Sequence, residues 1–309
     1  MKREKDYSVK QVYKKFMKKN KVKKLAKDTM EYYETIYIKF NRYLKKQDIN
    51  KIENITEDVI DDYNLYLQNQ DNLSINTVVT YMKGLRAFLY YCMKNDWMDE
   101  FKITLPKGNK NIKKGYNKKQ LERLLKKPNL KKCTFAEYRN WLIINFLLDN
   151  GCRSATLRNI KIRDLDLEDG HVKFTKMKHG GTHIVPMSQT LIKRISDYLE
   201  VREGSPDDYL FPNIFGKKIT RPGLGSAIKR YCTKRDVENH SVHAFRHEFS
   251  RLFIKNGGTI YKLKFVLGHK SIETTNHYVN LLLVDIKVDF GDCNPLEIMT
   301  NEKKAIKLK

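Results

Sequence analysis

The chain has 309 residues, and its 61 Lys and Arg residues against 36 Asp and Glu residues give a formal net charge of +25 at pH 7. Such a charge favours a polyanionic partner, and nucleic acid is the leading candidate. No run of about 18 apolar residues is present, and no apolar signal-peptide stretch follows the Lys-rich N-terminus. The sequence therefore disfavours a membrane-spanning or exported protein, and we expect a cytoplasmic location.

The cysteines also point to a reducing compartment. There are five, widely spaced and without a Cys-x-x-Cys pair: Cys92, Cys133, Cys152, Cys232 and Cys293. An odd number at such spacings indicates reduced thiols rather than a disulfide framework or a zinc site.

The first half of the chain predicts a small helical domain, in keeping with a length typical of two domains. Its first thirty residues hold twelve Lys or Arg and three acidic residues, so we expect a basic arm, either extended or a solvated helix. Apolar residues then recur at steps of three and four, which is typical of helices with one buried face. These helices are expected from Tyr33 to Leu44, from a cap at Thr56, and from about Ser74 to Tyr91.

A basic linker follows, where Pro106, Gly108 and Gly115 are mixed with six lysines. Pro and Gly disfavour regular structure, and the lysines suit a path along a phosphate backbone. The predicted organisation is a helical DNA-binding domain with its arm at 1–105, a linker at 106–118, a second domain at 119–290, and a tail at 291–309.

The second half is predicted to be mainly helical with one small sheet. Thr134 with Glu137 matches a capping box before a strongly apolar run, and Gly151 suits the left-handed position after that helix. Val172 and Phe174, a turn at 178–181, and Ile184 with Val185 predict a β-hairpin. Helical periodicity returns from residue 242 to residue 278.

Three separated stretches carry side chains that can act on a phosphate. They are Asn150-Gly-Cys-Arg-Ser154, His243-Ala-Phe-Arg-His247, and Leu267-Gly-His-Lys270, with Tyr278 nine residues after His269. Each alone is commonplace. Breaking a phosphodiester without a metal needs positive donors on the non-bridging oxygens, a nucleophile and a proton source. Together the three stretches provide all of these.

In this order the stretches resemble the tyrosine recombinase (phage integrase) family, in its simple two-domain form. That family carries an Arg after a Gly-containing helix end, a His-x-x-Arg, a Leu-Gly-His, and a Tyr nine residues further on. The resemblance spans Asn150 to Tyr278, and the first domain and linker are similar to the family's core-binding domain and its connection. It implies a mainly α fold, with a SAM-like core-binding domain followed by an α-rich catalytic domain with a small β-sheet.

The resemblance also implies how the site works. Tyr278 would attack the scissile phosphate of duplex DNA, leaving a 3′-phosphotyrosyl link and a free 5′-hydroxyl. That link stores the bond energy, so no ATP, metal or other cofactor is expected. Arg153 and Arg246 would hold the phosphate, because a planar guanidinium matches its oxygens.

Three further residues would manage protons and orientation. His243 would take the proton of Tyr278, since a phenol with a pKa near about 10 is a poor nucleophile at neutral pH. His269 would hydrogen-bond the phosphate. In the family a hairpin Lys protonates the leaving 5′-oxygen; counting back eight residues from Pro186 gives Lys178, with Lys176 as the second choice.

Two positions depart from the family pattern. The family has an acidic residue three positions after the first Arg, but here Ser154, Ala155 and Thr156 follow Arg153, so the supporting carboxylate is missing. This puts efficiency in doubt more than mechanism. His247 stands where a small residue is common, and we have no physical account of it.

Structural interpretations of the same residues stay open. Arg246 could instead form an ion pair with Glu248 or Glu273. His269 could be a histidine at a helix end, and Tyr278 could be part of the hydrophobic core. His243 and His247 could also be a metal pair, although no His-Glu-x-x-His or Cys partner accompanies them.

DNA contacts and assembly follow from the same resemblance. Affinity would come mainly from phosphate contacts and fall steeply with salt. The candidates on the third helix and the linker are Thr77, Thr80, Lys83, Arg86, Lys110, Lys113 and Lys114. The apolar segment from Val279 suggests docking on a neighbouring subunit within a DNA-bound tetramer, with packing on its own domain as the alternative. An accessory DNA-bending or directionality protein is compatible with this assembly.

The leading function is therefore site-specific recombination, with integration and excision of a mobile element ahead of Xer-like dimer resolution. A type IB-like topoisomerase would use the same residues without strand exchange between partners. A catalytically silent DNA-binding regulator is the alternative from another class, but such proteins usually lose the Tyr or an Arg, and both are present here.

Overall fold

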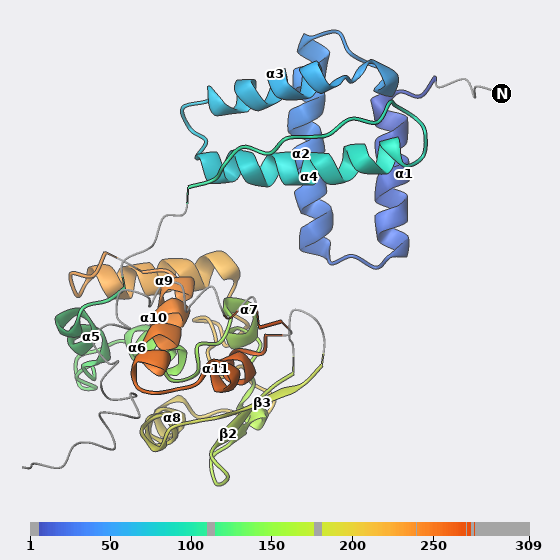
Figure 1. Ribbon diagram of the computed structural model, residues 1–309. Coiled ribbons are helices and arrows are strands. Elements are labelled where there is room, and N and C mark those ends of the chain that lie inside the picture. The colour runs from blue at the N-terminus through green and yellow to red at the C-terminus, as the bar shows by residue number, and fades with distance from the viewer. Residues whose placement is uncertain are drawn as a thin grey trace, which may run out of the picture. The chain divides into compact units, whose positions relative to one another are not determined.

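The computed structural model describes residues 6–109, 115–175, 181–238, 240–269, 271, 272 and 275 (Figure 1). The chain divides into two compact units at residue 111, inside the predicted linker. Each unit has its own hydrophobic core.

The N-terminal unit is a set of packed helices. They are α1 (Val9–Val22), α2 (Lys27–Lys46), the 3₁₀ turn η1 (Ile52–Asn54), α3 (Glu57–Gln68) and α4 (Ile75–Met93). Thr56 and Ser74 cap α3 and α4 by accepting a backbone N–H three residues on, as predicted. The predicted apolar stripes of α3 and α4 are buried. The sequence therefore placed these two helices correctly.

Helices α2 and α4 cross closely at Gly84. A Cβ there would overlap the side chains of Ile36 and Tyr32 on α2. The Tyr32 hydroxyl donates to the carbonyl of Thr80 at 2.6 Å, and this hydrogen bond joins α2 to α4 at the crossing. Gly84 is thus needed for the approach of the two backbones.

The Lys-rich start of the chain differs from the expected arm. Ser8 begins α1 with a complete capping box, and Val12, Tyr13 and Phe16 of α1 are buried in the core. The stacked rings of Tyr13 and Tyr37 lie 3.7 Å apart between centroids. The prediction of an extended or solvated arm was wrong for these residues, because an apolar stripe lies between the lysines and outweighs their repulsion.

The second unit holds the remaining elements. They are α5 (Lys118–Leu125), α6 (Phe135–Asn150), α7 (Ser154–Leu157), η2 (Ile162–Asp164), β1 (Leu165–Asp166), β2 (His171–Phe174), β3 (His183–Pro186), α8 (Gln189–Arg202), α9 (Arg221–Thr233), α10 (Val242–Lys255) and α11 (Ile260–Leu267). The three strands form an antiparallel sheet in the order β1-β2-β3. The predicted hairpin is present as β2 and β3, with Val172 opposite Val185; β1 was not predicted.

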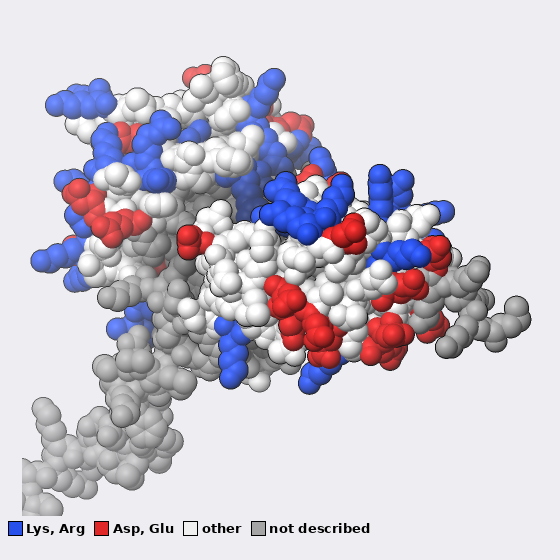
Figure 2. Space-filling model, turned by 90° about the horizontal axis from the view of Figure 1, so that it is seen from above, with Lys and Arg blue, Asp and Glu red and all other residues white. Residues whose placement is uncertain are grey.

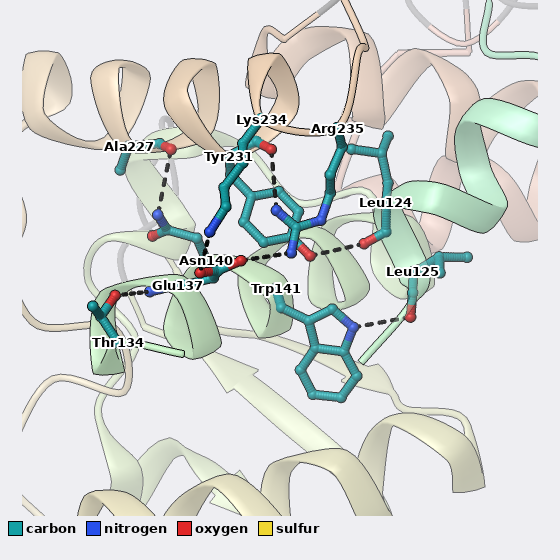
Figure 3. Close-up of polar contacts among 10 residues, drawn as sticks. All are labelled: Leu124, Leu125, Thr134, Glu137, Asn140, Trp141, Ala227, Tyr231, Lys234 and Arg235. Atoms are coloured by element: carbon teal, nitrogen blue, oxygen red, sulfur yellow. Dashed lines mark hydrogen bonds and ion pairs between the residues drawn. The ribbon is translucent and has the colours of Figure 1, made fainter. Parts of the chain in front are cut away.

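Helix α6 is the centre of this unit, packed against α5, α8, α9 and α10. Trp141 to Leu147 are all buried, Asn145 included, which explains why the sequence shows a strongly apolar run instead of a stripe. Thr134 caps the helix as predicted, by accepting the N–H of Glu137. The Glu137 carboxylate binds Lys234 and Arg235 instead, so the predicted reciprocal capping bond is replaced by bonds to the two residues that follow α9 (Figure 3).

None of the described helices is long and apolar enough to cross a membrane.

Candidate active site

Three helix ends converge on the predicted site. Helix α6 ends at Gly151, which has the predicted left-handed conformation with φ of 58°, and Arg153 follows as the N-cap of α7. Helix α10 carries Arg246, and α11 ends at Gly268, also left-handed with φ of 61°. Both glycines turn the backbone sharply where most side chains would strain it, and each brings a nearby carbonyl to the arginines.

Arg246 is held by neutral acceptors. Its side chain is buried, and its Nη1 donates to the carbonyl of Gly151 at 2.7 Å. Its Nη2 donates to the carbonyl of Leu267 at 3.3 Å and lies 2.6 Å from Nε2 of His269. Among the described residues no carboxylate pairs with it. The alternative pairing with Glu248 is wrong, since Glu248 binds Arg251, and Glu273 lies outside the described residues.

Arg153 reaches the same acceptor. Its Nη1 donates to the carbonyl of Leu267 at 3.5 Å, so Arg153 and Arg246 share one oxygen atom. Two cations around one neutral oxygen is an arrangement that a phosphate oxygen would improve, because a charged acceptor strengthens both bonds.

The tautomer of His269 follows from its partners. A guanidinium can only donate, so Nε2 of His269 accepts from Arg246 and carries no proton. Nδ1 then carries the proton and donates to the hydroxyl of Thr275 at 2.9 Å. Burial, reinforced by the nearby charges of Arg246 and Arg153, lowers the pKa of His269 to about 4. The imidazole is therefore neutral at physiological pH.

His243 lies in the first turn of α10, three residues before Arg246 and hence on the same side of the helix. Its side chain is exposed. The structure thus brings four predicted residues to adjoining elements, namely Arg153, His243, Arg246 and His269.

The other predicted catalytic residues lie outside the described part of the chain. These are Tyr278 and Lys178, together with the second choice, Lys176. Strands β2 and β3 are described on both sides of the segment that holds the two lysines. The linker residues Lys110, Lys113 and Lys114 are likewise outside the described residues.

The predicted contact residues on α4 are only partly available. The hydroxyl of Thr80 donates to the carbonyl of Asn76 at 2.8 Å, and that of Thr77 lies 2.9 Å from the Ser74 hydroxyl. Arg86 lies over the ring of Tyr90, with 6.0 Å to its centroid, whereas Lys83 is exposed. Lys83 therefore has the greatest freedom to reach a phosphate.

Charge differs between the helices of the N-terminal unit. On the face that Figure 2 displays, Lys and Arg lie in several groups, with Asp and Glu next to some of them. In the N-terminal unit the exposed lysines of α1 contrast with four exposed acidic residues on α3, namely Glu57, Asp58, Asp61 and Asp62. Such separation favours a polyanion on one side of the unit.

Sequence reasoning missed, or recognised only in part, two features near the site. Thr156, where the family carboxylate would stand, is buried. Glu248 is the buried carboxylate of α10, and it accepts the backbone N–H of Tyr116 at 3.2 Å. Its proximity to the His-x-x-Arg stretch was the only available signal.

One group of described residues has the spacing for a metal ligand set, and it comprises Asp166, Asp169 and His171 at the β1–β2 turn. Asp166 accepts the N–H of Asp169 there, as ordinary turns do. No predicted site residue belongs to this group.

Comparison with known proteins agrees with both units. The Phage integrase family matches residues 115–283, and the Phage integrase SAM-like domain matches residues 8–110. Among curated relatives, tyrosine recombinase XerD of Staphylococcus haemolyticus strain JCSC1435 is 25% identical over 282 residues, covering 88% of this chain and 94% of that protein. XerD of Listeria monocytogenes serotype 4b is 26% identical over 238 residues, covering 73% and 78%.

Solved structures share the fold. The Tn1549 transposon integrase in complex with transposon right end DNA has a TM-score of 0.73 at 18% identity, covering 91% of this chain and 99% of that one. The XerH recombinase in a post-cleavage complex with its difH substrate has a TM-score of 0.67 at 23% identity, covering 85% and 79%. With the family match over more than half of its length, the chain belongs to the phage integrase family of tyrosine recombinases, enzymes that cut and rejoin DNA.

Proposed function

We propose that this site-specific recombinase cleaves duplex DNA through Tyr278, with the scissile phosphate held by Arg153 and Arg246. The observation that carries the proposal is the shared carbonyl of Leu267, on which both guanidiniums converge. A non-bridging phosphate oxygen is a stronger acceptor of the same kind, so it would take the place of that carbonyl.

The proposed chemistry balances without a cofactor. The phenolic oxygen of Tyr278 bonds to phosphorus while its proton passes to His243, and the bond from phosphorus to the 5′-oxygen breaks. Lys178 gives a proton to that leaving oxygen. In rejoining, the 5′-hydroxyl attacks the phosphotyrosyl link, and both protons return.

The proposed part of His269 is to hold Arg246 and to meet the phosphate. As a neutral acceptor it keeps the guanidinium in place without adding positive charge to the site. When the phosphate draws Arg246 towards its own oxygens, Nε2 is released, and a proton shift between the ring nitrogens lets it donate.

The proposed setting is duplex DNA bound by a homotetramer in the cytoplasm. The apolar segment from Val279 would dock on a neighbouring subunit, and an accessory DNA-bending or directionality protein fits the same assembly. Lys83 and the linker residues Lys110, Lys113 and Lys114 are the proposed phosphate contacts; Thr77, Thr80 and Arg86 are weaker candidates. The missing carboxylate near Arg153 favours a mobile-element enzyme over a housekeeping Xer-like one.

Covalent trapping tests the chemistry and finds the target together. Wild type and Tyr278→Phe are incubated with fragmented genomic DNA of the host, denatured with SDS, and the DNA linked to protein through a 3′ end is sequenced. We expect adducts from wild type alone, concentrated at a few sites. Sites at the ends of a mobile element support integration and excision, whereas one chromosomal site supports dimer resolution.

Two outcomes contradict the proposal. Adducts spread over any DNA, with relaxation of supercoiled plasmid, point to topoisomerase-like action. DNA binding without any adduct points to a silent regulator.

A further inference from the structure

The linker is attached at its far end to the helix that carries His243 and Arg246. Tyr116, the second described residue after the gap in the linker, is buried, and its ring stacks on Phe245 of α10 with centroids 5.0 Å apart and an interplanar angle of 15°. Its backbone N–H donates to Oε2 of Glu248 at 3.2 Å. Phe245 and Glu248 flank Arg246 in the sequence, so the linker contacts α10 beside the predicted phosphate-binding arginine.

Glu248 is held from both sides. Arg251 donates to its Oε1 at 2.6 Å and to its Oε2 at 3.3 Å, and only 1% of the Glu248 side chain is exposed. A Glu–Arg ion pair between residues three apart on a helix can form on an exposed surface, with no other segment of the chain packed against it. The burial of this carboxylate requires a cover, and Gly115 with Tyr116 lies close against it, since a Cβ on Gly115 would lie 2.6 Å from Oε2.

The near end of the linker is attached to the N-terminal unit. Nδ2 of Asn76, at the start of α4, donates to the carbonyl of Asn109 at 3.0 Å. The chain between these attachments is the seven-residue step from Asn109 to Tyr116. The two attachments therefore lie on either side of the part of the linker outside the described residues.

We propose that Glu248 is a positioning residue that fixes the inter-domain linker to α10, so that the entry of the chain into the catalytic unit and the places of His243 and Arg246 are set together. The inference rests on the proposed function. A small displacement of catalytic side chains is costly to the rate even where substrate affinity is kept. Loosening the attachment should therefore slow cleavage more than it weakens DNA binding.

Two independent changes break the attachment in different ways. Glu248→Gln keeps an acceptor oxygen but removes the charge that Arg251 binds. Gly115→Ala keeps both charges but places a methyl group 2.6 Å from Oε2 of Glu248 and 3.1 Å from Nε of Arg251, so it pushes the linker away from the ion pair. The matched controls are Glu200→Gln, an exposed glutamate of α8, and Gly225→Ala, a glycine of α9 with open space where the Cβ would stand.

The experiment uses full-length protein and the duplexes that wild type captures in covalent trapping. For each variant we would measure the Kd by fluorescence anisotropy and the single-turnover rate of adduct formation at saturating protein, at a temperature where thermal melts show every variant folded. We expect both test variants to form adduct about tenfold or more slowly, with Kd within about twofold of wild type, and both controls to match wild type.

Each outcome decides the inference. Test variants that form adduct as fast as wild type overturn it, and so do variants whose Kd weakens as much as their rate falls, because a general loss of structure would explain that. If wild type itself forms no adduct, the proposed function fails and the inference falls with it; adduct from wild type with unchanged variants defeats the inference alone.

Discussion

Cationic side chains gather at both ends of α6, and the two groups share acceptors of different kinds. At the N-terminal end, Lys234 and Arg235 share the carboxylate of Glu137, at 2.9 and 2.8 Å (Figure 3). At the other end, about 24 Å along the helix, Arg153 and Arg246 share an uncharged carbonyl. In the first group a carboxylate binds both cations, whereas in the second both cations donate to an uncharged main-chain oxygen.

Burial does not by itself separate the two groups. Arg139 of α6 is also buried and donates to the carbonyl of Pro212 at 2.5 Å and to the side-chain oxygen of Asn140. What distinguishes the C-terminal end is that two guanidiniums meet at one neutral main-chain oxygen.

The largest expected effect is on catalysis at Arg246. Arg246→Lys keeps one positive charge but loses the forked donors, so adduct formation should fall by about a hundredfold or more, equivalent to roughly 3 kcal/mol of transition-state stabilisation. The measurement is the single-turnover rate on a captured duplex. An Arg235→Lys variant is the control, and a similar loss there would remove the distinction between the two ends.

The next effect is acid sensitivity from His269. Its pKa is lowered from 6.5 to about 4 in the folded protein, so the unfolded chain binds the proton more readily. The contribution of His269 to the free energy of unfolding is fully present above pH 6.5. It is lost as the pH falls from 6.5 towards 4, and the loss is roughly 3 kcal/mol. Thermal melts across this range should show a smaller loss in His269→Asn. Equal losses in both proteins would mean that another group is responsible.

A smaller effect is expected at the paired end. Arg235 is 15% exposed, binds Glu137, and lies over the ring of Tyr231 at 3.6 Å from its centroid. Arg235→Ala should lower the free energy of unfolding by about 2 kcal/mol, since it removes a charged hydrogen bond and a cation–π contact. Urea denaturation measures this. The rate of adduct formation, taken where the variant is folded, should stay at the wild-type value.

The smallest effect is expected at Lys234, which shares the same carboxylate but is 67% exposed. Lys234→Ala should cost less than about 1 kcal/mol, because water screens an exposed ion pair. The same urea series compares it with Arg235→Ala. Equal costs would show that Glu137 is held by charge alone and not by the buried geometry of Arg235.

Much of the fold could be predicted because its signals are local. Thr56, Ser74 and Thr134 are caps that lie next to the stripes or runs they begin, and Gly151 ends α6 as expected. Helix α1 was misjudged because twelve cations in thirty residues concealed a short apolar stripe. Strand β1, with two residues, is too short to leave a pattern.

The candidate site likewise contains residues with a sequence signal and contacts without one. Arg153, His243, Arg246 and His269 are marked by residue type and order along the chain. The carbonyl of Leu267 has no sequence signature, because every residue has one. The contact of Tyr116 with Glu248 joins positions 132 residues apart, and no local pattern connects them.

The shared acceptor at Leu267 has an evolutionary consequence. A carboxylate that organised the two arginines could be deleted by a single substitution, and it would compete with the phosphate for them. A main-chain oxygen survives any replacement of its own side chain that leaves α11 folded, and it yields readily to a stronger acceptor. The arginines can thus stay aligned through long divergence of the surrounding side chains, position 267 included, as long as Gly151 and Gly268 keep the left-handed turns at the two helix ends.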